Sequence, residues 1–176
     1  GYVTVIQTNK PEFKWSDATL NFKRPNKNNL VIYELWVYDH TPSRNIKGLI
    51  DRLNYIEDLG VNAVELMPIT EFDGNDSWGY SPNHFFALDK VYGSPDELKT
   101  FIDECHKRGI AVILDMVFNH ATGLNPMNKL YPYGTDLSSN PWFNATAPHS
   151  DNVYEDWNHD FVPTKTMFTR SLAYWL

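Results

Sequence analysis

The chain has 176 residues, of which 42% are hydrophobic and 21% charged, and its formal net charge is −7 at pH 7. This length supports one compact domain with a substantial core and leaves little room for two. The acidic balance argues against nucleic acid or a membrane surface as a partner, and no apolar run reaches the roughly 18–20 residues of a membrane-spanning helix. No signal peptide is visible at the start, but a mature chain would have lost one, so secreted, periplasmic and cytoplasmic locations all stay open.

The beginning of the chain differs in composition from the rest. Residues 1–29 are polar and mixed, and residues 23–29 have the composition of a linker. We therefore expect residues 1–29 to be a linker or the end of a preceding β-domain. They lead into residues 30–38, which are rich in β-branched and aromatic side chains and are predicted to form a strand.

Two helices are predicted downstream of this strand. Residues 46–59 place apolar side chains at the 3.6-residue spacing of one helix, which Gly60 ends. The second helix begins after Ser94, an N-cap residue that is followed by Pro95 at the first helical position and by Glu97 as the partner of a capping box. The buried stripe of this second helix is expected to consist of Leu98, Phe101, Ile102 and Cys105.

Each helix is followed by a short apolar strand, at residues 62–66 and 110–114, and the second strand has the composition of one buried on both faces. This order predicts a parallel sheet of right-handed βαβ units, an α/β fold. Residues 119–165 are predicted to be irregular, and a loop of that length is usually functional or forms a small subdomain. A last helix is predicted from about Thr166, and its apolar end indicates that the chain is cut from a longer reading frame.

Ligands of parallel α/β folds bind at the carboxyl ends of the strands, and the exit of the third predicted strand is the most informative place. Asp115 ends this strand, and Asn119 and His120 follow it. A buried carboxylate needs a cationic or hydrogen-bonding partner, and no Arg lies near Asp115 in the sequence. A capping Asp beside a hydrogen-bonded His is the plain structural alternative to a functional site.

These residues resemble a known family. Residues 115–120 (Asp-Met-Val-Phe-Asn-His) after an apolar strand resemble the first signature region of the α-amylase superfamily, glycoside hydrolase family 13. Residues 78–82 (Trp-Gly-Tyr-Ser-Pro) and 92–98 (Tyr-Gly-Ser-Pro-Asp-Glu-Leu) resemble the second βα loop and helix of that family. Residues 32–35 resemble its first barrel strand in branching-enzyme and pullulanase-like members. The four blocks occur in order and at compatible spacing, so the resemblance is specific and runs from about residue 30 to 176.

The resemblance implies a fold and an activity. The fold is a partial (β/α)₈ TIM barrel, with the first three βα units and a long loop after the third strand. Residues 30–176 are the N-terminal portion of the catalytic domain, truncated before the fourth strand. The full-length protein is expected to hydrolyse or transfer α-1,4 or α-1,6 glucosidic bonds of an α-glucan with retention. The aromatic content of 15% suits such a ligand, because flat side chains stack on the apolar faces of sugar rings.

The resemblance also implies roles for single residues. Asp115 supports the catalytic centre by bonding an Arg of the next strand, and His120 donates a hydrogen bond to hydroxyls of the sugar at the cleavage point. Tyr80 stacks beneath the same sugar ring, and Trp78 belongs to the same substrate-binding loop. Asn119 is a calcium ligand in many amylases, although branching and debranching members often lack the ion.

Calcium needs six to eight oxygen ligands, so Asn119 alone does not make a site. The long loop offers further carboxylates, although acidic loop residues are usually only solvated: Asp136, Asp151, Asp156 and Asp160. No other cofactor is implied.

The catalytic carboxylates themselves are expected to lie outside this chain. A retaining glycosidase needs two carboxyl groups roughly 5–5.5 Å apart, and the resemblance places them after the fourth and fifth strands. Asp115 is therefore not the nucleophile. Glu34, Glu65 and Glu71 are poor substitutes, because the first two lie in strands and have no partner placed by the sequence.

Two alternatives to an enzyme stay open at this point. The chain could belong to a non-catalytic carbohydrate-binding or interaction module derived from the same barrel. A doubly wound nucleotide-binding protein is disfavoured, because no glycine-rich phosphate loop follows any predicted strand. A partial barrel exposes an open strand edge and apolar faces, so the isolated chain is predicted to self-associate or to be marginally folded.

Overall fold

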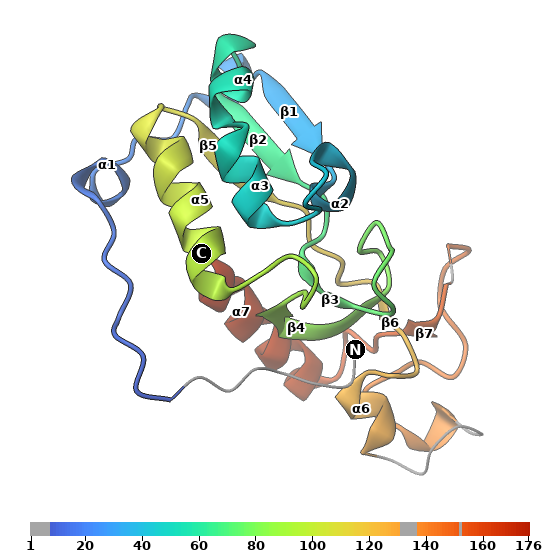
Figure 1. The fold of residues 1–176 in the computed structure, drawn as a ribbon. Coiled ribbons are helices and arrows are strands. Elements are labelled where there is room, and N and C mark those ends of the chain that lie inside the picture. The colour runs from blue at the N-terminus through green and yellow to red at the C-terminus, as the bar shows by residue number, and fades with distance from the viewer. Residues whose placement is uncertain (1–7, 131–136, 152) are drawn as a thin grey trace. The chain divides into compact units, whose positions relative to one another are not determined.

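The computed structural model describes residues 8–130, 137–151 and 153–176. The chain divides into two compact units, which we treat separately (Figure 1). The sheet unit contains the described residues up to 69 together with residues 88–115. The loop unit contains residues 70–87 and the described residues from 116 onward. No helix in the described ranges combines the length and apolarity that a membrane span requires.

A three-stranded parallel sheet forms the centre of the sheet unit, in the order β1-β2-β5. Its strands are β1 (Ile32–Leu35), β2 (Ala63–Leu66) and β5 (Ala111–Leu114). Leu35 pairs with Leu66 and Leu66 with Leu114, so the three strands end in register. The arrows of β1 and β2 in Figure 1 point the same way. This arrangement confirms the parallel βαβ order predicted from the sequence.

The first predicted strand is shorter than the sequence pattern suggests. Strand β1 covers four residues, and α2 (Val37–His40) follows it as a single helical turn. Trp36 between them keeps an extended backbone and caps that turn. The strand predicted over residues 30–38 was therefore too long at both ends. Its aromatic and β-branched residues favour a strand locally, but tertiary context outweighs local β-propensity.

The first predicted helix is two helices. Helix α3 (Ile46–Asp51) and helix α4 (Leu53–Asp58) are separated by Arg52, whose φ of −100° and ψ of 0° interrupt the helical ladder. The apolar periodicity runs through this break, with Leu49, Leu53 and Ile56 all fully buried. Periodicity reports which face is buried and does not detect a local change of backbone angle, so it predicted one helix over residues 46–59.

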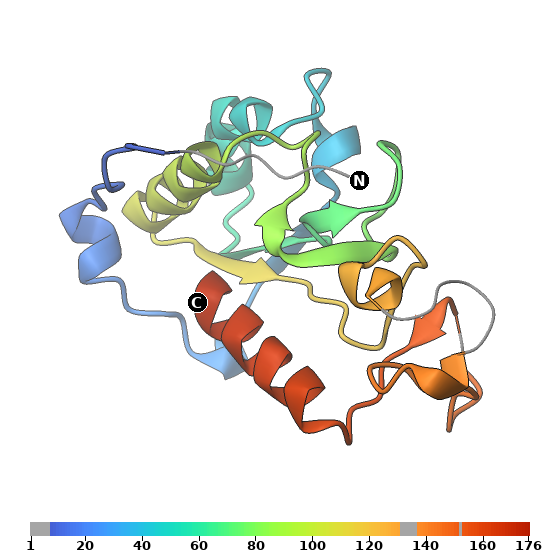
Figure 2. The same cartoon turned by 90° about the horizontal axis from the view of Figure 1, so that it is seen from below.

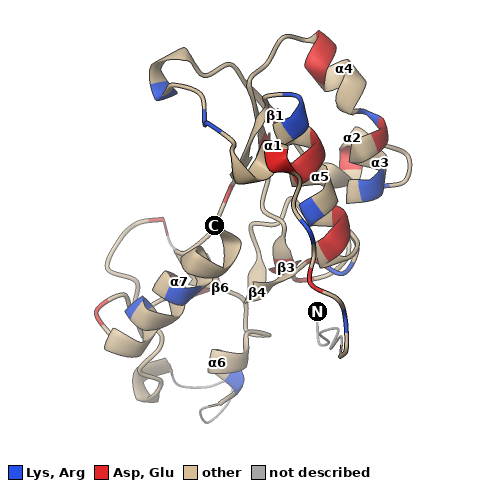
Figure 3. Cartoon of the chain, turned by 90° about the vertical axis from the view of Figure 1, so that its left-hand side faces the viewer, with Lys and Arg blue, Asp and Glu red and all other residues tan. Residues whose placement is uncertain are grey.

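Helix α5 (Pro95–Lys107) agrees with its prediction at both ends, and Leu98, Phe101 and Cys105 of the predicted stripe are buried, but Ile102 is only half-buried and Asp103 is buried instead. Both hydrogen bonds of the capping box between Ser94 and Glu97 are present. Gly109 has a φ of +72°, the left-handed conformation that follows a helix end. Acidic and basic residues both occur along this helix (Figure 3), and Lys107 and the C-cap residue Arg108 each pair with Glu104.

Strand β5 is less buried than predicted. All four of its residues are half-buried, whereas a strand covered on both faces was expected. The physical reason is its position, because β5 pairs with β2 on one side and is an edge strand within the described sheet.

The segment before β1 is tied to the sheet unit. Helix α1 (Asp17–Leu20) lies against α5, where the buried Asp103 carboxylate accepts hydrogen bonds from the Ser16 backbone and from the Ser16 and Thr19 hydroxyls at 2.7–3.0 Å. The Phe22 ring stacks on His106 at 3.9 Å. A single 3₁₀ turn, η1 (Lys27–Asn29), leads into β1. The boundary predicted at residue 29 stays a prediction, but part of this segment is anchored by specific bonds.

The loop unit has more regular structure than the sequence predicted. A two-stranded sheet is formed by β3 (Thr70–Phe72) and β4 (Pro82–Leu88), and a second one by β6 (His120–Ala121) and β7 (Glu155–Asp156). Short helices α6 (Pro126–Lys129) and η2 (Leu137–Ser139) lie within the region predicted to be irregular. Pairing between β6 and β7 joins residues far apart in sequence, which local patterns do not reveal.

Helix α7 (Val162–Trp175) closes the loop unit and is visible as the dark red helix in Figure 2. It begins four residues before the predicted Thr166, with Pro163 in its first turn. The loop unit has its own aromatic core of Phe85, Phe143, Trp157 and Phe168. Ser171 and Trp175 of α7 both donate hydrogen bonds to the Phe85 carbonyl at 2.8 Å.

Candidate functional site

The carboxyl ends of the three parallel strands place Trp36, Met67 and Asp115 at one edge of the sheet unit, because each directly follows a strand whose last residues are in register. The Asp115 backbone N–H donates to the Leu66 carbonyl at 3.0 Å, which fixes the exit of β5. This is the edge at which parallel α/β proteins bind ligands. The predicted bond from Asp115 to an Arg of a fourth strand stays a prediction, because the parallel sheet of the described residues has three strands.

An aromatic stack surrounds the exit of β1. The rings of Trp36 and Tyr38 stack 5.1 Å apart, and the Arg44 guanidinium lies 4.4 Å from the centre of the Tyr38 ring. The Trp36 indole donates a hydrogen bond to the Tyr92 hydroxyl at 3.2 Å. Sequence analysis placed Trp36 and Tyr38 in a strand and so missed this stack.

The turn between β3 and β4 carries two aromatic residues of the predicted site. Trp78 is 62% exposed and Tyr80 39% exposed. The Ser77 hydroxyl accepts a hydrogen bond from the Gly79 backbone at 3.0 Å, and Gly79 has a φ of +92°. These features shape the turn so that both aromatic side chains reach the surface, where a flat ligand can stack on them.

His120 lies in the same unit as this turn and fixes it. Its ring is 6% exposed, and its Nε2 lies 2.8 Å from the Tyr80 carbonyl oxygen. The side-chain amide of Asn119 donates to Nδ1 at 3.1 Å. Because a carbonyl only accepts and an amide N–H only donates, His120 carries its proton on Nε2. The predicted hydrogen bond from His120 to a sugar stays a prediction, and it would require Nε2–H to change partner.

The described carboxylates do not gather around Asn119 into a ready-made calcium site. Nowhere in the described ranges do three or more His, Cys, Asp or Glu side chains gather as metal ligands would. Asp156 is buried, but Asn144 and His149 already bond its two oxygens at 2.7 and 2.8 Å. Asp151 and Asp160 are exposed, and Asp136 falls outside the described residues. The role of Asn119 as a calcium ligand therefore stays a prediction.

Two residues near His120 were missed by the sequence analysis. Tyr154 is 59% exposed, and its ring centre lies 5.5 Å from that of His120. Burial raises the pKa of Glu155, an effect that its own backbone and the charge of Lys129 only partly oppose. The β6–β7 pairing brings both residues here across a long stretch of sequence, and no local motif marks either of them.

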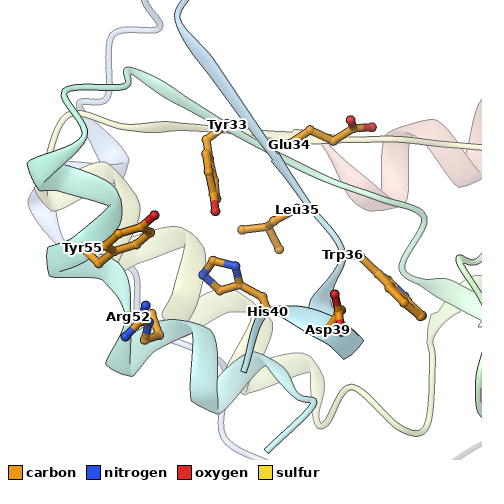
Figure 4. A pocket seen from close by; sticks show the side chains of 8 residues that line it. All are labelled: Tyr33, Glu34, Leu35, Trp36, Asp39, His40, Arg52 and Tyr55. Atoms are coloured by element: carbon orange, nitrogen blue, oxygen red, sulfur yellow. The ribbon is translucent and has the colours of Figure 1, made fainter. Parts of the chain in front are cut away.

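A further pocket of about 370 Å³ lies along the outer edge of β1 (Figure 4). Figure 4 shows Tyr33, His40 and Tyr55 converging there beside Arg52. Among the described residues, the buried His40 Nε2 has no hydrogen-bond partner, and burial followed by the Arg52 charge lowers the His40 pKa. In a closed barrel the free edge of the first strand pairs with the last strand, so this pocket lies where later parts of a barrel belong.

Comparison with known proteins assigns the family. Residues 18–175 match the family model described as "Alpha amylase, catalytic domain". The chain belongs to the α-amylase catalytic-domain family. This match confirms the resemblance and the predicted fold class, the first part of a (β/α)₈ barrel.

Relatives of this α-amylase-family chain have been curated and solved. A malto-oligosyltrehalose trehalohydrolase of Saccharolobus solfataricus is 40% identical over 157 residues, which cover 87% of this chain and 27% of that protein. A 1,4-alpha-glucan branching enzyme of Xanthomonas campestris is 34% identical over 172 residues, which cover 90% and 22%. The α-amylase of Geobacillus thermoleovorans, solved with acarbose, matches with a TM-score of 0.69 at 26% identity, covering 83% and 37%. This chain therefore spans about a quarter of the length of the curated relatives.

Proposed function

We propose that this chain is the N-terminal part of a retaining α-glucan hydrolase or transglycosidase and that it carries one wall of the sugar-binding cleft. One observation carries the proposal. The buried His120, from the family block at residues 115–120, forms a hydrogen bond with the backbone of the turn that presents Trp78 and Tyr80, from the block at residues 78–82. Two exposed aromatic faces beside polar groups suit a sugar ring, whose faces are apolar and whose rim carries hydroxyls.

Each site residue has a proposed role. Tyr80 stacks beneath the sugar at the cleavage point, and Trp78 extends the same aromatic surface. Asp115 orients an Arg of the fourth strand towards the catalytic centre. The names of the relatives, a malto-oligosyltrehalose trehalohydrolase and a 1,4-alpha-glucan branching enzyme, support an α-glucan as the substrate class.

The chain alone is expected to be inactive, because three strands of eight cannot form the barrel that presents two catalytic carboxyl groups. The exposed edges of β1 and β5 are expected to cause self-association of the isolated chain. Size-exclusion chromatography tests this, and a stable monomer would contradict it.

The decisive experiment compares the full-length protein that carries this chain with the isolated chain. Both are assayed with chromogenic maltooligosaccharides and with branched α-glucan, and binding is measured by calorimetry. Turnover by the full-length protein alone supports the proposal. Binding without turnover by the full-length protein favours the non-catalytic carbohydrate-binding module instead, and absence of both overturns the proposal.

A further inference from the structure

Tyr154 is the most unusual residue of the loop unit. It lies immediately before β7, and the pairing of Glu155 with Ala121 and of Asp156 with His120 fixes its position beside the β6 strand. Its ring leans on the His120 ring at an interplanar angle of 40° and a centroid distance of 5.5 Å. In spite of this contact it is 59% exposed. The side chain thus presents much of its surface to solvent directly beside a buried imidazole.

The backbone at Tyr154 is strained. Its φ is +56°, in the left-handed region that a bulky aromatic residue rarely adopts, whereas Gly or Asn would occupy it at little cost. Residues held in such conformations cluster at ligand-binding and active sites, because the surrounding structure must enforce them. Here the β6–β7 pairing supplies that enforcement. A tyrosine kept in this position by pairing, and left exposed, is better explained by a ligand than by packing.

His120 contacts both Tyr154 and Tyr80. The His120 ring contacts the Tyr154 ring on one hand and bonds the Tyr80 carbonyl on the other, so one imidazole positions two exposed tyrosines that are far apart in sequence. All three residues belong to the loop unit. The Tyr154 ring is therefore a second exposed aromatic face beside the imidazole that anchors the turn bearing Tyr80.

Resting on the proposed function, we propose that Tyr154 is a second aromatic contact of the α-glucan site, which adds binding energy for a sugar ring bound beside His120. The contact is apolar stacking, so it depends on the ring and not on the phenol hydroxyl. Because the ring binds substrate and transition state alike, its loss raises KM and leaves kcat unchanged.

The test uses four variants of the full-length protein. Tyr154→Phe keeps the ring, Tyr154→Ala and Tyr154→Gly remove it, and Tyr174→Ala is the matched control, since Tyr174 is a 56% exposed tyrosine on α7. We expect KM for a maltooligosaccharide to rise roughly 3- to 10-fold in the Ala and Gly variants, as loss of one aromatic contact implies. The Phe variant and the Tyr174 control are expected to match the wild type.

Thermal unfolding separates the ring from the backbone. Tyr154→Gly relieves the left-handed strain and is expected to melt above Tyr154→Ala, while both show the same rise in KM. A difference in KM between these two variants would show that the loop conformation, and not the ring, acts on the substrate. Unchanged KM in Tyr154→Ala overturns the inference, provided that the wild-type protein is active on the sugar. If the wild type neither binds nor cleaves any α-glucan, it is the proposed function that fails.

Discussion

The His120 Nε2–H donates to the backbone carbonyl of Tyr80 over 2.8 Å, and so joins two segments that lie forty positions apart in the chain. The sequence blocks around these residues were recognised separately, one as a turn and the other as a strand exit. Their connection is a hydrogen bond to backbone, which holds the turn whatever side chain stands at position 80. His120 thereby positions the aromatic turn in addition to any contact it makes with a sugar.

Replacement of His120 by Ala is expected to destabilise the chain. The substitution leaves the Tyr80 carbonyl and the Asn119 amide without this partner, and an unsatisfied polar group of this kind costs about 1–3 kcal/mol when it stays buried. Urea unfolding of the full-length protein measures the loss. His159→Ala is the matched control, since His159 is an exposed histidine of the same unit. An effect of His120→Ala no larger than that of the control contradicts the positioning role.

Asp103 is expected to make stability fall at low pH. Burial by itself would raise the pKa of this carboxyl, but hydrogen bonds from Thr19, Lys107 and Ser16 outweigh it and hold the pKa well below its ordinary value. Because the folded state lowers this pKa, the stabilisation is fully present above the unfolded pKa of about 4 and is lost as pH falls below it.

Asp103→Asn tests this expectation. The variant should be less stable than the wild type at pH 7, and the difference should shrink progressively below about pH 4. Asp58→Asn, at an exposed position at the end of α4, is the control and should show little effect at either pH. A stability difference for Asp103→Asn that is constant from pH 7 to pH 2 would argue against the carboxylate bonds as its source.

Glu155 is expected to show the opposite pH dependence. Burial raises its pKa, and its buried Oε2 has no hydrogen-bond partner within the described part of the chain. Since the folded state raises this pKa, both states are protonated at low pH and the cost of the buried charge appears as pH rises above about 4.3, the ordinary pKa of a glutamate. Glu155→Gln should therefore melt above the wild type at pH 7 and equal to it near pH 3. Higher stability of the wild type at pH 7 would refute this.

The parts of the fold that sequence analysis predicted well are those set by local chemistry. The capping box of Ser94 and Glu97 and the helix end before the left-handed Gly60 are decided within one or two turns of chain, and both were predicted correctly. The break at Arg52 was missed because it leaves the apolar face continuous. The burial of β5 was overestimated because it depends on the neighbouring strands. The apolar sequence of β5 is typical of a strand with a neighbour on each side, whereas β5 is an edge strand of the described sheet.

In the candidate site, too, features set by local sequence were predicted and features set by long-range pairing were not. Tyr80 and His120 were identified because each stands in a recognisable local block, but the bond between them and the position of Tyr154 are set by pairing across the loop unit. The pairing of β6 with β7 brings together residues 120–121 and 155–156, and neither strand is longer than two residues. Two-residue strands carry no periodic pattern, so no sequence signal could have indicated Tyr154.

Tyr80→Ala separates the aromatic contact from the anchor beneath it. The bond to His120 uses the backbone carbonyl of residue 80, so this substitution removes the ring and leaves the bond intact, whereas His120→Ala removes the bond and leaves the ring. We expect Tyr80→Ala in the full-length protein to bind a maltooligosaccharide about tenfold more weakly, with a melting temperature close to that of the wild type. Tyr80→Phe should restore binding, because stacking needs only the ring. Isothermal titration calorimetry and thermal unfolding measure the two effects, and weaker binding that always accompanies a lower melting temperature would mean that position 80 acts through the fold of the turn.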